Sequence, residues 1–152
     1  MALVTVIAMG IACAEEAKKD DKKACEAPPT ELVKKDLKPG ADHPIKFRTL
    51  IYVDYTGWFY DGCAPDHKGA KFDSSEGRKT PFGFMVGAGK VIKGWDEGLI
   101  GMKENGKRLL VIPPDKAYGA AGFPPRIPPN STLVFEIDYI KYMGDPAPQP
   151  GQ

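Results

Sequence analysis

The sequence predicts an α+β domain in which an antiparallel β-sheet wraps around one short α-helix. Two long segments rich in β-branched and aromatic residues predict strands, one over Phe47 to Tyr60 and one over Thr132 to Tyr142. Both alternate apolar and polar residues, which is typical of strands with one face on a core and the other in water. Helical spacing is found in the stretch from Val91 to Leu99.

The predicted helix is amphipathic and contains two glycines. Val91, Trp95 and Leu99 are four residues apart and therefore line one face. Gly94 and Gly98 each cost about 1 kcal/mol relative to alanine inside a helix, so tertiary packing must hold this one. The two glycines indicate that the helix backbone closely approaches a flat surface. On spacing alone, Trp95 is a central core residue.

Shorter strands are expected elsewhere in the domain. Glu31 to Lys38 precedes a turn, and Arg108 to Ile112 is a buried apolar strand. Gly57 is expected to bend or bulge the long strand that contains it. Phe72 and Asp73 are neighbours, so on a regular strand their side chains point to opposite faces. We expect one of them to bend inward at an edge.

A loop with large apolar side chains precedes the last strand. Residues 117–129 include Tyr118, Phe123 and Ile127 outside regular structure. Loops are normally polar, so large apolar side chains in a loop must cover something. The sequence leaves open whether this loop is a lid over the core or a wall of a ligand site.

The two ends of the chain differ in composition from the middle. Residues 1–14 contain an apolar run followed by Ala12-Cys13-Ala14, which fits a signal-peptide cleavage site, and Cys13 is alternatively a lipoprotein acceptor. Residues 15–30 form a charged tether, residues 31–143 the folded domain and residues 144–152 a Pro-rich flexible tail. These features predict export of the protein.

The three cysteines leave more than one arrangement open. If Cys13 leaves with the signal or is lipidated, Cys25 and Cys63 remain and could form a disulfide in an oxidising compartment. Two free thiols, or pairing between chains, fit equally well because Cys25 lies in the tether.

Charge and histidine content exclude several functions. A total of 21 basic and 20 acidic residues gives a net charge of +1, without the basic footprint of a protein that binds nucleic acid or an anionic membrane. Cys63, Asp66 and His67 share one loop, but a closed metal site needs four ligands, so we expect a solvated loop. His43 and His67 lie in polar loops, which argues against a histidine-dependent hydrolase. We expect neither a metal nor a cofactor.

Eight short motifs occur along the chain in a fixed order. They are Tyr55-Thr-Gly57, Phe72-Asp-Ser-Ser75, Pro81-Phe82, Phe84-Met85, Val91-Ile-Lys-Gly-Trp-Asp-Glu-Gly98, Ala117-Tyr-Gly119, Ile127-Pro-Pro129 and Leu133-Val-Phe135. With these motifs the region from Glu31 to Tyr142 resembles the FKBP-type peptidyl-prolyl cis-trans isomerases. The long loop between Tyr60 and Phe72 is similar to that of bacterial secreted or envelope members, which implies a periplasmic or envelope location.

The resemblance implies a fold, an activity and a set of site residues. The implied activity is rotation about X-Pro bonds of unfolded or nascent polypeptides in a dry aromatic pocket, without a cofactor. Catalytic roles are implied for Asp73, Tyr118, Tyr55 and Trp95, with Trp95 as the floor under the substrate proline. The residues implied to bind the substrate are Phe72, Phe82, Val91, Ile92, Phe123, Ile127, Phe135 and Arg78. Macrolides such as rapamycin are implied as further ligands.

Two rim positions depart from the better-known family members, and one alternative function stays open. Phe123 stands where they often carry histidine, and Arg126 stands where they carry an aliphatic residue. We expect Arg126 to favour acidic residues beside the proline. The alternative function is a holdase chaperone of the envelope that binds peptides with little turnover.

Overall fold

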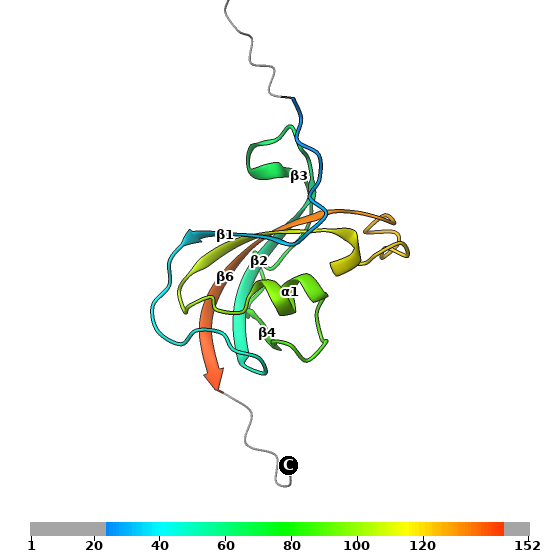
Figure 1. Ribbon diagram of the computed structural model, residues 1–152. Coiled ribbons are helices and arrows are strands. Elements are labelled where there is room, and N and C mark those ends of the chain that lie inside the picture. The colour runs from blue at the N-terminus through cyan, green and yellow to red at the C-terminus, as the bar shows by residue number, and fades with distance from the viewer. Residues whose placement is uncertain (1–23, 145–152) are drawn as a thin grey trace, which may run out of the picture.

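The computed structural model describes residues 24–144 of the 152-residue chain (Figure 1). Its elements are β1 (Val33–Lys38), β2 (Leu50–Tyr60), the 3₁₀ turn η1 (Pro65–His67), β3 (Lys68–Ser74), β4 (Phe82–Met85), α1 (Lys93–Gly98), β5 (Lys107–Ile112), the 3₁₀ turn η2 (Pro114–Lys116) and β6 (Leu133–Gly144). The six strands form one sheet in the order β1-β5-β6-β2-β3, and β4 also pairs with β2. All pairings are antiparallel, which confirms the predicted fold class.

The sheet curves around α1, which lies against its inner face (Figure 1). An ideal Cβ on Gly94 would come within 2.4 Å of Ile112 Cγ2, and one on Gly98 would come within 2.8 Å of Leu110. These distances are too short for any side chain larger than hydrogen. The close approach predicted from the two glycines is therefore confirmed, and β5 is the surface they approach.

The helix is shorter than the sequence pattern predicts. Ile92 has an extended backbone, with φ −60° and ψ 149°, so α1 begins at Lys93 and Val91 lies before it. Val91 is therefore not on the buried face of the helix, and it is partly exposed where Trp95 and Leu99 are buried. The prediction from spacing was wrong at this end of the helix. Ile92 is apolar and fits the helical pattern, but its backbone is extended, so the helix does not reach Val91.

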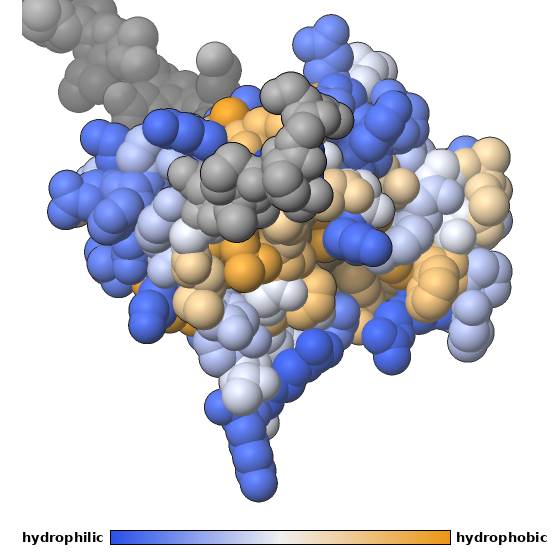
Figure 2. Space-filling view, turned by 90° about the horizontal axis from the view of Figure 1, so that it is seen from below, coloured by the Kyte–Doolittle hydropathy of each residue, from blue (hydrophilic) through white to orange (hydrophobic). Residues whose placement is uncertain are grey.

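The central strands β2 and β6 supply much of the core. Alternate residues of both are fully covered, as expected from the sequence, including Ile51 and Val53 on β2 and Leu133, Ile137 and Tyr139 on β6. Their long antiparallel pairing joins the two halves of the chain. Apolar side chains that remain at the surface gather toward the middle of the lower face, with hydrophilic ones around them (Figure 2).

Arg108 ties β1 to the end of α1. Its side chain is nearly buried and donates through Nε and Nη2 to the carboxylate of Asp36 on β1, at 2.5 and 3.2 Å. Its Nη1 donates to the carbonyls of Gly98 and Ile100, at 2.8 and 3.1 Å. Carbonyls at a helix C-terminus have no partner within the helix, so this guanidinium satisfies them.

The described part of the segment expected to be a tether is attached to the domain. Cys25 forms a disulfide with Cys63, and the amide of Glu26 donates to the carbonyl of Gly62 at 3.0 Å. The Tyr60 hydroxyl is within 3.1 Å of the Glu26 carbonyl. The intramolecular disulfide decides between the arrangements that the sequence left open, and it removes Cys63 from any metal site.

Several other expectations lie outside the described residues. They are the signal or lipoprotein segment with Cys13, the rest of the tether and the Pro-rich tail after Gly144. Within residues 24–144, no helix is long and apolar enough to cross a membrane.

Candidate functional site

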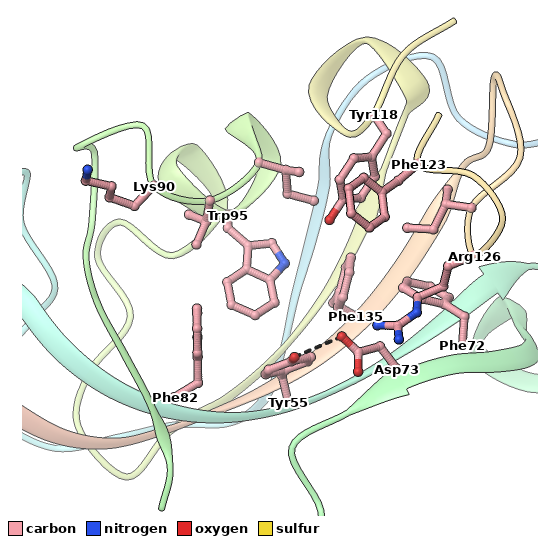
Figure 3. Close-up of a pocket in the computed structure, with 13 residues that line it drawn as sticks. Tyr55, Phe72, Asp73, Phe82, Lys90, Trp95, Tyr118, Phe123, Arg126 and Phe135 are labelled. Atoms are coloured by element: carbon pink, nitrogen blue, oxygen red, sulfur yellow. Dashed lines mark hydrogen bonds between the residues drawn. The ribbon is translucent and has the colours of Figure 1, made fainter. Parts of the chain in front are cut away.

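A pocket of about 200 Å³ opens between α1, the edge of the sheet and the loop that follows η2 (Figure 3). Thirteen residues line it: Tyr55, Phe72, Asp73, Phe82, Lys90, Val91, Ile92, Trp95, Tyr118, Phe123, Arg126, Ile127 and Phe135. Aromatic and aliphatic side chains dominate this lining, so the pocket favours an apolar group of moderate size.

Trp95 lies at the centre of the pocket and belongs equally to the core. Its side chain is 4% exposed, and the rings of Tyr55 and Phe135 stand nearly perpendicular to it at centroid distances of 5.1 and 5.2 Å. Such edge-to-face contacts fix the orientation of the indole. The Nε1 of Trp95 has no hydrogen-bond partner among the described residues. The packing of the rings therefore holds this side chain, without help from a hydrogen bond.

A bulge in β3, opposite Gly57 of β2, brings two neighbouring residues of β3 into the same pocket. The pairing of β2 with β3 shifts register after Gly57, which faces Asp73. Both Phe72 and Asp73 line the pocket, although side chains alternate on a regular strand. An ideal Cβ on Gly57 would come within 2.7 Å of the Phe135 ring and 2.8 Å of the Phe72 ring. Glycine at this position thus leaves room for the aromatic wall. The extra residue of the bulge is Phe72 on β3, and β2 stays in register with β6 through Gly57, so the bulge expected in the strand that contains Gly57 lies in its neighbour instead.

Asp73 is the acidic residue of the pocket, and each of its oxygens is hydrogen-bonded. The Tyr55 hydroxyl donates to Oδ2 at 2.9 Å, and the Ser74 amide donates to Oδ1 at 2.9 Å. Arg78 Nη2 lies 3.5 Å from Oδ1, and its guanidinium lies over the Tyr55 ring. Burial raises the pKa of Tyr55, and its hydrogen bond to Asp73 raises it further. The tyrosine therefore remains a neutral donor, and the carboxylate is held in one orientation.

The loop after η2 forms the opposite wall. Tyr118 is 37% exposed, and its ring lies 5.7 Å from that of Phe123, which is 58% exposed. Burial raises the pKa of the Tyr118 hydroxyl, as does the negative charge of Asp73, while the positive charge of Arg126 lowers it. No hydrogen bond from this hydroxyl to a described residue is formed in the structure, so the Tyr118 phenol is a donor that faces the pocket.

Contacts within the loop and with α1 hold this wall in place. The Phe123 amide donates to the Ile127 carbonyl at 2.8 Å, and the Ile127 amide donates back at 2.9 Å. Ile127 is 2% exposed and anchors the loop in the core. An ion pair joins Lys116, on η2, to Glu97 on α1. The loop is thus a wall of the pocket, as well as a cover over the core.

Comparison with known proteins identifies the family of this chain. Residues 42–140 match the family model described as FKBP-type peptidyl-prolyl cis-trans isomerase. The chain belongs to this family.

Several characterised proteins are similar over most of the domain. Peptidyl-prolyl cis-trans isomerase FKBP2 of Mus musculus is 47% identical over 108 residues, which cover 69% of this chain and 72% of the relative. FK506-binding protein of Neisseria meningitidis serogroup A is 46% identical over 110 residues, which cover 72% of this chain and 94% of the relative. The crystal structure of AtFKBP13 superposes with a TM-score of 0.64 at 36% identity, covering 76% of this chain and 96% of that one. The isomerase activity of the FKBP-type family is therefore the function of this chain.

The structure brings together nearly all the site residues that the sequence predicted. All of them line the pocket except Arg78, which lies behind Asp73 and contacts it instead. Lys90 lines the pocket although sequence reasoning missed it, because a single lysine in a glycine-containing loop carries no periodic signal. Asp96 was also missed as a support of the FKBP-type pocket. Its carboxylate accepts hydrogen bonds from the amides of Gly87 and Gly89, at 2.7 and 3.2 Å.

The alternative metal site in the loop after β2 does not form within the described residues. Cys63 is in the disulfide, and His67 is paired with Glu26 at 3.4 Å and stacked on Tyr60 at 5.0 Å. No group of three potential metal ligands occurs between residues 24 and 144. The loop instead attaches the N-terminal segment to this FKBP-type domain.

Proposed function

We propose that this FKBP-type isomerase catalyses X-Pro rotation by holding the proline ring over Trp95 while the preceding amide twists between Asp73 and Tyr118. The observation that carries this assignment is the aromatic pocket with Trp95 at its centre, lined also by Asp73 and Tyr118. Phe82 and Phe135 stand beside the indole and would enclose the ring. The substrates would be proline-containing segments of unfolded or nascent polypeptides.

The physical requirement for catalysis is a lower barrier to rotation, without any bond being cut. The amide C–N bond has partial double-bond character, and its rotation barrier is about 18–20 kcal/mol. The twisted amide has lost the resonance that separates charge in the planar form, so a dry apolar pocket disfavours the planar ground state relative to the transition state. The residues that line this pocket include no serine, cysteine or histidine, and this mechanism needs none.

The two polar groups at the edge would act on the substrate carbonyls. The Tyr118 hydroxyl would donate a hydrogen bond to a substrate carbonyl, which orients the chain across the pocket. Asp73, fixed by Tyr55 and Arg78, would supply a preorganised negative charge beside the rotating bond. Because these partners hold the carboxylate before the substrate arrives, little reorganisation is needed during rotation.

The test is isomerisation of a proline peptide by the purified domain and by Trp95→Phe. Wild type should accelerate the reaction well above background. Trp95→Phe removes an indole N–H that has no partner in residues 24–144, so the variant loses packing without losing a hydrogen bond seen there. We expect about 1–3 kcal/mol lower stability with a reduced kcat/KM. An absence of acceleration by wild type would overturn the proposal. Suppression of aggregation by wild type without turnover would support the holdase alternative.

We further propose that the pocket binds macrolides such as rapamycin and that the protein acts after export, in the periplasm or envelope. The pocket supports the first proposal through its apolar lining, and a relative carries the name FK506-binding protein. The disulfide between Cys25 and Cys63 supports the second, because such bonds persist in oxidising compartments. Competition between rapamycin and a proline peptide tests the first, and the intact mass of the mature protein tests the second.

A further inference from the structure

Two positive side chains stand at the mouth of an otherwise apolar pocket. Lys90 lies in the loop between β4 and α1, and Arg126 lies in the loop between η2 and β6. Figure 3 shows them on opposite sides of Trp95. A polypeptide whose proline occupies the pocket would therefore pass one cation on each side.

Neither of these two side chains forms an ion pair within the described residues, although Asp73 lies on the same side of the pocket as Arg126. Arg126 and Lys90 are exposed, and neither side chain forms an ion pair or hydrogen bond in residues 24–144. Other charges around the site differ, since Asp73 is paired with Arg78 and Lys116 with Glu97. The mouth of the pocket therefore presents net positive charge that is free to meet a ligand.

Hydrogen bonds anchor the backbone at or next to both cations. Arg126 lies in a short turn in which its own amide donates to the Phe123 carbonyl at 3.0 Å, next to the paired Phe123 and Ile127. Lys90 follows Gly89, whose amide is held by the Asp96 carboxylate at 3.2 Å. Anchored backbone limits the positions that each side chain can sample, which reduces the entropy lost when it pairs with a ligand.

We propose that Lys90 and Arg126 make this enzyme prefer prolines flanked by acidic residues. The inference rests on the proposed function, because it takes the proline to lie over Trp95. An extended chain advances about 3.3–3.6 Å per residue, so residues immediately before and after the proline lie over the rim of the pocket, within reach of long side chains. Exposed charge pairs are weak, and each matched carboxylate should raise kcat/KM by about two- to fivefold at low salt.

The experiment compares peptides that differ only in charge beside the proline. One series carries Glu, Gln or Lys immediately before the proline, and a second carries them immediately after it. The readout is the ratio of kcat/KM for the Glu peptide to that for the Gln peptide, measured without a coupling protease. We expect wild type to rank Glu above Gln above Lys, and 0.5 M NaCl to compress the ranking, because salt screens exposed charges.

Single substitutions show which cation acts on the residue before the proline and which acts on the residue after it. Arg126→Met should bring the Glu-to-Gln ratio close to one in one series, and Lys90→Met should do so in the other. Arg126→Glu should invert the preference in the series to which Arg126 responds. Lys93→Met removes an exposed lysine of α1 that does not line the pocket, so it should leave both ratios as in wild type.

The outcomes separate this inference from the proposed function. The charge preference would be overturned if all peptides turned over well at equal rates, or if the preference survived in both methionine variants. Either result would leave the isomerase assignment intact. No turnover of any peptide by wild type would overturn both.

Discussion

The hydroxyl of Tyr55 lies 2.9 Å from Oδ2 of Asp73 and joins the central strand β2 to the edge strand β3 within the pocket. The bulge at Phe72 in β3 turns Asp73 toward this hydroxyl, and Arg78 and the Ser74 amide donate to the other carboxylate oxygen. Three donors, the Tyr55 hydroxyl, the Ser74 amide and the Arg78 guanidinium, thus hold the Asp73 carboxylate in one orientation.

Tyr55→Phe should lower kcat/KM for proline peptides by about tenfold and lower the stability by about 1.5–3 kcal/mol. A hydrogen bond to a charged acceptor contributes about 1.5 kcal/mol or more, and here it orients the Asp73 carboxylate. Kinetics and urea unfolding of the same preparations check this. Tyr60→Phe is the matched control, because its hydroxyl contacts the Glu26 carbonyl away from the pocket and its kcat/KM should stay as in wild type. Equal losses of activity in the two variants would contradict the prediction.

Asp96→Ala should loosen the loop that carries Lys90 and Val91. Its carboxylate accepts from the amides of Gly87 and Gly89, so the variant leaves two backbone donors without their partners. We expect a loss of about 2 kcal/mol in urea unfolding and a rise in KM that exceeds the fall in kcat. Lys93→Met, on the same helix and exposed, should change neither. A fall in kcat alone would show that the loop does not position the substrate.

Tyr139 should make the protein sensitive to high pH. Its side chain is 1% exposed, and burial raises its pKa to about 12, with the charge of Glu104 adding to the shift. Because the pKa is higher in the folded state, this stabilisation is complete below the unfolded pKa of about 10 and disappears as the pH rises through 12.

The variant Tyr139→Phe isolates this effect. The Tyr139 hydroxyl has no partner among the described residues, so its removal should cost little at pH 8. Between pH 8 and pH 11.5, the variant should lose about 2 kcal/mol less stability in urea unfolding than wild type. Parallel losses in the two proteins would show that burial does not raise the pKa of Tyr139 above its unfolded value.

Removal of the disulfide should weaken the fold while leaving catalysis unchanged. Cys25 and Cys63 are 38 residues apart in sequence, and a cross-link of this span contributes up to about 4 kcal/mol by restricting the unfolded chain. The double variant Cys25→Ser with Cys63→Ser should therefore unfold at lower urea, with kcat/KM as in wild type because neither residue lines the pocket. Reduced wild-type protein should behave like the double variant. Unchanged stability in both would contradict the prediction.

The buried faces and the close helix contact could be predicted from sequence because they follow from local rules. Alternation of apolar residues predicts which faces of β2 and β6 are buried, and the observed burial of Ile51 and Ile137 agrees. Gly94 and Gly98 predict a close helix contact, because glycine alone tolerates that crowding. The resemblance to the FKBP-type family then predicts which side chains meet, which no local rule provides.

What the sequence by itself determined is the set of elements, the buried faces and the aromatic composition of the site. Only the tertiary structure decided that Cys25 pairs with Cys63, that Arg78 does not line the pocket, and that Lys90 stands across the pocket from Arg126. These relations join residues whose spacing along the chain carries no periodic signal. They depend on how separate loops pack against α1 and the sheet edge, and that packing is a property of the whole fold.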